Sequence, residues 1–167
     1  STARAGNVIG GGDFAENRII PDCIRAAYKS QEIIVRNPYS IRPYQHVLEP
    51  LYVYLMIAKA QCENIEFAGY YNVGPDECDC ITTGDLVDLF CKEWGNGQAW
   101  KNVCNQGPHE AQFLKLDCSK LKNTFGWGPR WQITEAVVKT VEWAKVYEQN
   151  DSIVDCMEKQ IRLFMLG

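Results

Sequence analysis

Residues 4–22, RAGNVIGGGDFAENRIIPD, combine a short strand-like lead-in, three consecutive glycines and the start of a helix. The glycines at positions 10–12 have no Cβ, so the backbone there can adopt positive φ and approach another segment or a ligand closely. Pro21 has a φ suited to a first helical turn, and apolar residues follow it at helical spacing. A strand, a glycine turn and a helix N-terminus in this order form a common anion-binding arrangement. A tight turn without a ligand is the alternative interpretation.

The composition is typical of a folded, globular chain. It has 167 residues, of which 46% are hydrophobic and 23% are charged, enough for one domain with its own core. The longest uncharged apolar run, residues 51–58, is far shorter than the roughly 20 residues of a membrane span. The first residues lack a signal-peptide pattern, so we expect a cytoplasmic protein without a membrane partner. The formal charge of −4 argues against nucleic acid as a partner.

The cysteines and histidines do not predict a metal site. The chain has eight cysteines, and their positions within expected helices favour reduced thiols over disulfides. Cys78 and Cys80 form only a C-x-C pair, which is too small a set of ligands for zinc. His46 and His109 lack a second histidine three or four residues away, so no helical histidine pair is predicted.

The remaining patterns predict an α/β chain with short strands, five or six helices and no second domain. Strands are expected over residues 1–9, 32–36, 70–74, 100–104 and 113–116, and helices over residues 21–29, 51–63, 81–95, 118–125, a segment from 134, and 154–164. The helix over residues 51–63 is expected to be buried because it is strongly apolar. Thr82 and Asp85 have the spacing of a capping box, and Gly126 is expected to end the helix before it.

Residues 41–50, IRPYQHVLEP, form an extended segment followed by a helix start. Period-two spacing places Arg42, Tyr44 and His46 on one face of that segment. We interpret His46 as a packed side chain and not as a catalytic base.

Two patterns expected of a complete nicotinamide-dependent enzyme are absent from the sequence. No dinucleotide-binding fingerprint of the form G-x-G-x-x-G is present, and no tyrosine is followed four residues later by lysine. We therefore expect no catalytic residue in this chain, and its cofactor-binding residues remain unassigned.

Five stretches occur in an order that resembles a known family. They are RAGNVIGGGDFAENRIIPD, RPYQHVLEPLYVYL, YYNVGP, FLKLDCSKLKNTFGW and a helix ending in TVEWA. This order resembles the C-terminal half of extended short-chain dehydrogenases/reductases of the NAD-dependent epimerase/dehydratase family, which act on nucleotide sugars. The GGGD turn and QHVLEP are most similar to the members that are 4,6-dehydratases of CDP-glucose.

The resemblance implies a doubly wound, Rossmann-type parallel sheet, with residues 1–167 as its substrate-binding half. The NAD-binding half, with its tyrosine and lysine, would then lie outside this chain, and the isolated chain would be inactive. In the family, NAD oxidises the sugar at C4, water is lost across C5 and C6, and hydride returns to C6. The resemblance also implies a lyase of lipopolysaccharide O-antigen deoxysugar biosynthesis that assembles as a homodimer or homotetramer.

The resemblance further implies a set of substrate-binding residues. Asn7 would hold the diphosphate-sugar, Arg42 the diphosphate and Arg18 the nucleotide. Ile33 and Val35 would pack against the pyrimidine, and Asn72 would lie near the phosphates. His109 would belong to the loop before the last strand. The full set of binding residues that the resemblance implies is Asn7, Arg18, Ile33, Val35, Arg42, Asn72 and His109.

Each of these assignments has a structural alternative. Asn7 and Asn72 could be turn asparagines that bind their own backbone, and Arg42 could form a surface ion pair with Glu49. His109 could be an exposed loop residue. Residues 106–108, QGP, stand where many relatives have an arginine, so that part of the phosphate site is not predicted.

Two other functions are compatible with these patterns. One is a UDP- or dTDP-sugar epimerase or dehydratase of the same superfamily, which nucleotide competition would distinguish. The other is a non-catalytic nucleotide-sugar-binding module.

Overall fold

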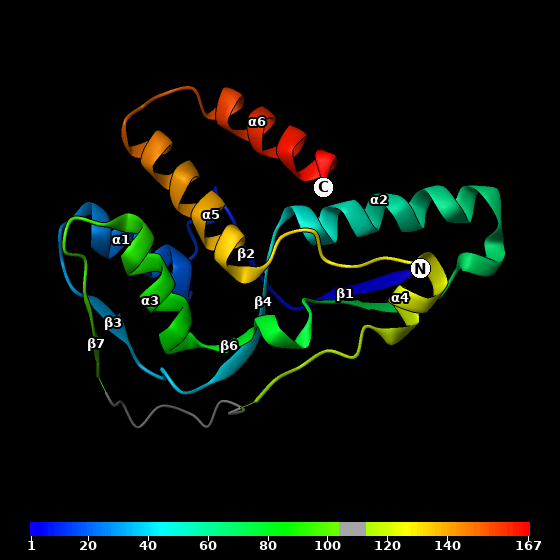
Figure 1. The fold of residues 1–167 in the computed structure, drawn as a ribbon, viewed down its shortest axis with the longest axis horizontal. Helices are drawn as coiled ribbons and strands as arrows, with labels where there is room; N and C mark the ends of the chain where they lie inside the picture. The colour runs from blue at the N-terminus through cyan, green and yellow to red at the C-terminus, as the bar shows by residue number, and fades with distance from the viewer. Residues whose placement is uncertain (104–112) are drawn as a thin grey trace.

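The computed structural model describes residues 1–103 and 113–167 of the chain, and Figure 1 shows their arrangement. The strands are β1 (Thr2–Ala5), β2 (Asn7–Ile9), β3 (Ile33–Val35), β4 (Ile41–His46), β5 (Tyr70–Val73), β6 (Cys80–Thr82) and β7 (Trp100–Asn102). The helices are α1 (Ile19–Tyr28), α2 (Leu48–Glu63), α3 (Thr83–Trp94), α4 (Ser119–Phe125), α5 (Ile133–Glu148) and α6 (Ile153–Leu166), with 3₁₀ turns η1 (Ile65–Phe67) and η2 (Glu77–Asp79).

The strands form three small sheets in which parallel pairing predominates. β1 pairs with β5, β2 with β4 and β3 with β7, all in parallel, while β6 adds to β4 in the antiparallel direction. Parallel pairs need long crossover connections, and α1 and α2 lie in two of these crossovers. The expected α/β class is confirmed, but the strand expected over residues 1–9 is divided at Gly6 into β1, which pairs with β5, and β2, which pairs with β4 in another sheet.

Two hydrophobic cores lie on either side of β4. The first lies among α1, α3, α5 and β3 and includes Ile20, Phe90 and Val141, all at most 2% exposed. The second lies among α2, α4 and β5 and includes Val53 and Leu121. Figure 1 shows α1, α3 and α5 together at one end of the molecule and α2, α4 and β1 at the other. β4 therefore joins two separately packed parts.

The helix ends follow from short capping patterns. The Thr82 side chain accepts a hydrogen bond from the Asp85 amide at 3.0 Å, and the Asp85 carboxylate accepts from the Thr82 amide at 3.3 Å, which completes the expected capping box at α3. Gly126 ends α4 with a φ of 61°, a conformation that costs glycine little. Both ends are as the sequence predicts.

Two further expectations about secondary structure and burial are wrong. α2 buries Val53 and Ile57, but Leu51 and Leu55 are 47% and 72% exposed, because no described segment packs on that side of the helix. Residues 113–116 do not form a strand, and Phe113 makes only an isolated bridge with Ile41. The spacing of hydrophobic residues in a segment does not show which other segment will pack against it.

Three observations concern the described residues alone. None of their helices is long and apolar enough to cross a membrane. No cluster of three or more histidine, cysteine or acidic side chains among them could hold a metal ion. The seven cysteines within the described ranges are free thiols.

Candidate functional site

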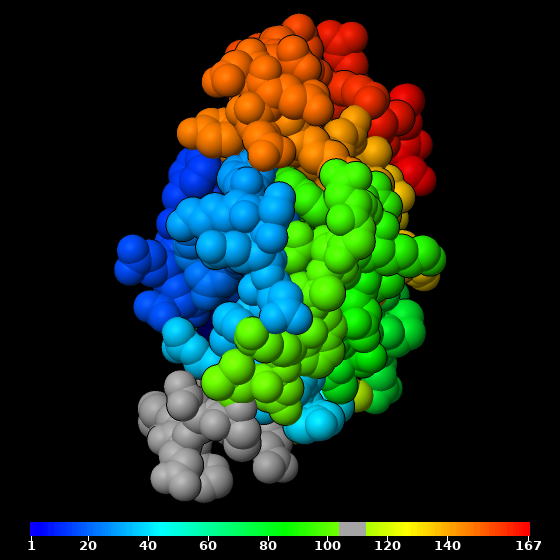
Figure 2. All heavy atoms as spheres, turned by 90° about the vertical axis from the view of Figure 1, so that its left-hand side faces the viewer, coloured from blue at the N-terminus to red at the C-terminus, as the bar shows by residue number. Residues whose placement is uncertain are grey.

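A large cavity lies where the N-terminus of α1 meets β3 and β4. Its volume is about 990 Å³, and its walls come from residues 6–10, 13, 17–22, 34–40, 42 and 44, with Thr83 and Asn102. Figure 2 shows this face of the molecule, with the segments around residues 10–20 and 30–45 in blue and cyan. The size is at the upper end of the range for small-molecule sites.

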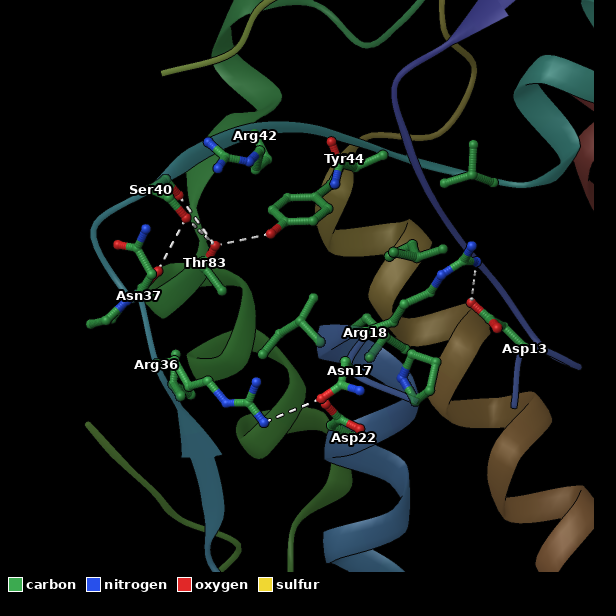
Figure 3. A pocket seen from close by; sticks show the side chains of 18 of the residues that line it. Asp13, Asn17, Arg18, Asp22, Arg36, Asn37, Ser40, Arg42, Tyr44 and Thr83 are labelled. Atoms are coloured by element: carbon green, nitrogen blue, oxygen red, sulfur yellow. Dashed lines mark hydrogen bonds and ion pairs between the residues drawn. The ribbon is translucent and has the colours of Figure 1, made fainter. Parts of the chain in front are cut away.

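The charged side chains that line the cavity are three arginines and two aspartates. Arg18, Arg36 and Arg42 line it together with Asp13 and Asp22, as Figure 3 shows. Asp22 already forms an ion pair with Arg25 of the same helix. The positive end of the α1 dipole also lies at this wall, so the site favours an anionic ligand.

Arg18 is held only loosely at the start of α1. Its Nη1 lies 3.2 Å from Asp13 Oδ2, but the Arg18 side chain is 66% exposed, and exposed ion pairs contribute about 0–1 kcal/mol. The pair therefore leaves Arg18 able to turn toward a stronger anion.

Arg42 projects from β4 into the cavity beside Tyr44, as the two-residue spacing predicts (Figure 3). Arg42 Nη1 donates a hydrogen bond of 2.9 Å to the carbonyl of Ile41.

A buried cluster of hydroxyl groups connects β4 with the first turn of α3. Thr83 Oγ1 lies 2.9 Å from Ser40 Oγ and 3.0 Å from the Tyr44 hydroxyl, and it also donates to the Ser40 carbonyl at 3.2 Å. Ser40 Oγ in turn donates to the Asn37 carbonyl at 3.1 Å. The cluster fixes the turn before β4 and therefore the position of Arg42. No local pattern in the sequence predicts this cluster, and only the capping box at Thr82 marks this helix start.

His46 belongs to the core and does not line the cavity. It is 2% exposed, packs edge-on against Trp131 at 4.9 Å between ring centroids, and accepts a hydrogen bond from the Leu48 amide at Nδ1. Burial, with a smaller contribution from Lys139, lowers the pKa of His46 to about 4. The ring is therefore neutral near pH 7, as expected of a packed histidine.

Glu49 is buried and does not form a surface ion pair. It is 0% exposed, and its Oε1 accepts hydrogen bonds of 2.8 Å from the amides of Arg130 and Trp131. Burial raises the pKa of Glu49, while these two amides and the Arg130 charge act in the opposite direction. The surface pairing of Arg42 with Glu49 considered above does not occur.

The glycine turn packs against an aromatic ring. A Cβ built on Gly11 would lie 2.5 Å from Cδ1 of Trp143 and closer still to Cγ and Cδ2. Gly12 has a φ of 80° and Gly10 lines the cavity. At Gly11, close backbone approach serves packing against α5, whereas Gly10 contributes to the cavity wall.

The structure brings four of the seven predicted binding residues to this cavity, namely Asn7, Arg18, Val35 and Arg42. Ile33 is fully buried in the core, and the exposed neighbour Ile34 lines the cavity instead. The side chain of Asn72 donates to the Asp117 carbonyl at 3.0 Å and is not part of the cavity wall. His109 lies outside the described residues. The side chains of Asn17, Arg36 and Thr83 were not predicted, because they meet only through tertiary packing.

Comparisons with known proteins find similarity to dehydratases and epimerases of nucleotide sugars. No protein-family model matches the chain. It is 43% identical over 166 residues to the CDP-glucose 4,6-dehydratase of Salmonella typhimurium, an alignment that covers 99% of this chain and 46% of the relative. The chain therefore spans about half the length of the curated relative that it matches.

Solved structures share the fold at lower identity. The dTDP-glucose 4,6-dehydratase of Bacillus anthracis in complex with NAD superposes with a TM-score of 0.70 at 17% identity, over 88% of this chain and 45% of that one. The UDP-glucose-4-epimerase of Stenotrophomonas maltophila gives 0.74 at 16% identity, over 89% of this chain and 48% of that one. These similarities establish the Rossmann-type dehydratase/epimerase fold.

Proposed function

We propose that the chain belongs to the nucleotide-sugar epimerase/dehydratase family of extended short-chain dehydrogenases/reductases and that it supplies the sugar-nucleotide site of a CDP-glucose 4,6-dehydratase. The overall reaction removes one water from CDP-glucose and gives CDP-4-keto-6-deoxyglucose. The observation that carries the proposal is the 43% identity, over nearly the whole chain, to an enzyme of that name.

The cavity supports this proposal because its groups match the parts of a nucleotide sugar. Arg42 presents a planar fork suited to paired phosphate oxygens, and Arg18 can turn toward the same anion. Asn7, at the start of β2, offers both a donor and an acceptor to a sugar or phosphate. In this proposal the described residues bind and orient the substrate, and none of them transfers a proton.

The described residues do not fit NAD at the glycine turn. Trp143 occupies the space beside Gly11, and the sequence has no dinucleotide fingerprint. We assign the NAD site, and the groups that act on C4, C5 and C6, to residues outside these 167. The proposed organisation is a substrate-binding part formed by residues 1–167 joined to a separate NAD-binding part, in a cytoplasmic homodimer or homotetramer.

The test is a product assay on the full-length protein that contains this chain. CDP-glucose, UDP-glucose and dTDP-glucose are each incubated with the protein and NAD, and mass spectrometry follows the loss of one water. The proposal predicts that CDP-glucose is dehydrated with a far higher kcat/KM than the other two sugars. Equal kcat/KM values would remove the CDP assignment, and epimerisation without loss of mass would identify an epimerase. Binding of the sugars without any turnover would indicate a non-catalytic module.

A further inference from the structure

One end of the cavity is formed by Asn17 and Arg36, which join two elements. Asn17 precedes α1 and has a φ of 61°, while Arg36 directly follows β3. Arg36 Nη2 donates a hydrogen bond of 3.2 Å to Asn17 Oδ1, and Figure 3 shows this contact at the opposite end of the cavity from Arg42. The two arginines are therefore placed to contact different parts of an elongated ligand.

Arg36 differs from the other charged groups at this wall. Arg18 pairs with Asp13, and Asp22 pairs with Arg25, whereas Arg36 forms no ion pair with any described residue. Its partner in residues 1–103 and 113–167 is the neutral oxygen of Asn17. An exposed hydrogen bond to an amide is readily exchanged for one to a ligand, so Arg36 can turn to an incoming acceptor.

The same end of the cavity provides apolar surface for a ring. Ile34 is 46% exposed and lines the cavity next to Arg36, and the half-buried Ile19 of α1 lines it from another element. Apolar surface combined with a few placed polar groups is what orients a planar ligand.

We propose, on the basis of the proposed function, that Arg36 and Asn17 form hydrogen bonds with the edge of the base. These contacts make the site select cytosine over uracil. Cytosine presents two adjacent acceptors, O2 and N3, and an amino donor at C4. A guanidinium has only donors, two of them parallel, so it can pair with O2 and N3. Asn17 Oδ1 can then accept from the amino group.

Uracil does not fit the same arrangement. Its N3 carries a hydrogen, which would face the N–H donors of Arg36, and its C4 oxygen would face Asn17 Oδ1. Turning the amide of Asn17 corrects the second conflict, but arginine has no acceptor with which to correct the first. Arg36 is therefore the main determinant of base choice, and Asn17 supports it.

The test is calorimetric titration of the full-length protein with CDP and with UDP. Wild type is expected to bind CDP at least about tenfold more tightly, the size of one good bidentate contact to a base. Arg36→Gln should remove most of this preference by weakening CDP and leaving UDP within about twofold. Arg36→Lys should recover only part of it, since a single ammonium cannot pair with both acceptors.

Two control variants separate base reading from other effects. Arg42→Gln should weaken CDP and UDP equally, because the two nucleotides share the diphosphate. Lys101→Gln removes a cation from the neighbouring strand β7, where it pairs with Glu32 and not with the cavity, and should leave both affinities unchanged.

The outcomes distinguish this inference from the proposed function. A wild-type protein that dehydrates CDP-glucose while Arg36→Gln loses CDP and UDP affinity equally would overturn base reading by Arg36 and leave the proposed function intact. A wild-type protein that binds neither nucleotide would overturn both.

Discussion

Gly11→Ala tests whether the glycine turn is shaped by its contact with α5. The added Cβ would lie 2.5 Å from Cδ1 of Trp143, whereas carbon atoms in contact are normally about 3.5–4.0 Å apart. Because Cγ and Cδ2 of Trp143 lie closer still to that Cβ, the ring or the turn must move by more than about 1 Å. Trp143 is 9% exposed and stacks on Tyr147 at 5.3 Å between centroids, so it has little room to move.

Forcing extra volume into a packed site usually costs about 1–3 kcal/mol, and we expect Gly11→Ala to lower the free energy of unfolding by about 3 kcal/mol. Urea unfolding followed by circular dichroism measures this value. Gly128→Ala is the matched control, because a Cβ there meets no atom within 4 Å and its φ is not positive. It should change stability by less than about 0.5 kcal/mol.

A double-mutant cycle identifies Trp143 as the cause. In a Trp143→Ala background the same glycine substitution should cost almost nothing, giving a coupling energy of about 2–3 kcal/mol. Trp143→Leu serves the same purpose if Trp143→Ala is too unstable to measure. A loss below about 0.5 kcal/mol for Gly11→Ala alone, or an equal loss in both backgrounds, would refute the packing explanation.

Two buried titratable groups give further predictions. The free energy of unfolding should fall by up to about 3 kcal/mol as pH drops from about 6.5 to about 4, because the unfolded chain binds a proton at His46 that the folded chain excludes. Since the pKa of His46 is lower in the folded chain, this stability is present above pH 6.5. Urea titrations should show that the stability of His46→Gln depends less steeply on pH than that of the wild type. Glu49→Leu should lower the free energy of unfolding by about 2–4 kcal/mol, because it leaves the amides of Arg130 and Trp131 unpaired. Glu49→Gln keeps an acceptor and should lower it by less than about 1 kcal/mol. Equal shifts in melting temperature for the two variants would exclude this role for the Glu49 oxygen.

The features predicted correctly from the sequence are those set by local chemistry. The capping box of Thr82 and Asp85 and the left-handed Gly126 depend on residues a few positions apart, and both occur in the structure. The alternation that places Arg42 and Tyr44 at one cavity needs only the period of a strand. The class of the fold follows from the order of such elements.

The features that were missed depend on contacts between distant segments. The glycine turn is visible in the sequence, but its partner Trp143 lies far along the chain, so an anion loop and a packed turn could not be separated. Leu51 and Leu55 look like core residues in the sequence, although the side of α2 that carries them is exposed. The pairing of Arg36 with Asn17 joins two loops, and no local pattern predicts it.

The most direct test of the account is a titration of CDP-glucose into the full-length protein and its Arg42→Ala variant. If Arg42 forms paired hydrogen bonds with the diphosphate, the variant should lose about 2–5 kcal/mol of binding free energy, as expected when one partner of a charge-assisted contact is removed. Arg42→Lys should recover only part of this binding free energy. Arg162→Ala, which removes an exposed arginine paired with Glu158 on α6, should bind as wild type does. An unchanged dissociation constant for Arg42→Ala would mean that this cavity is not the diphosphate site.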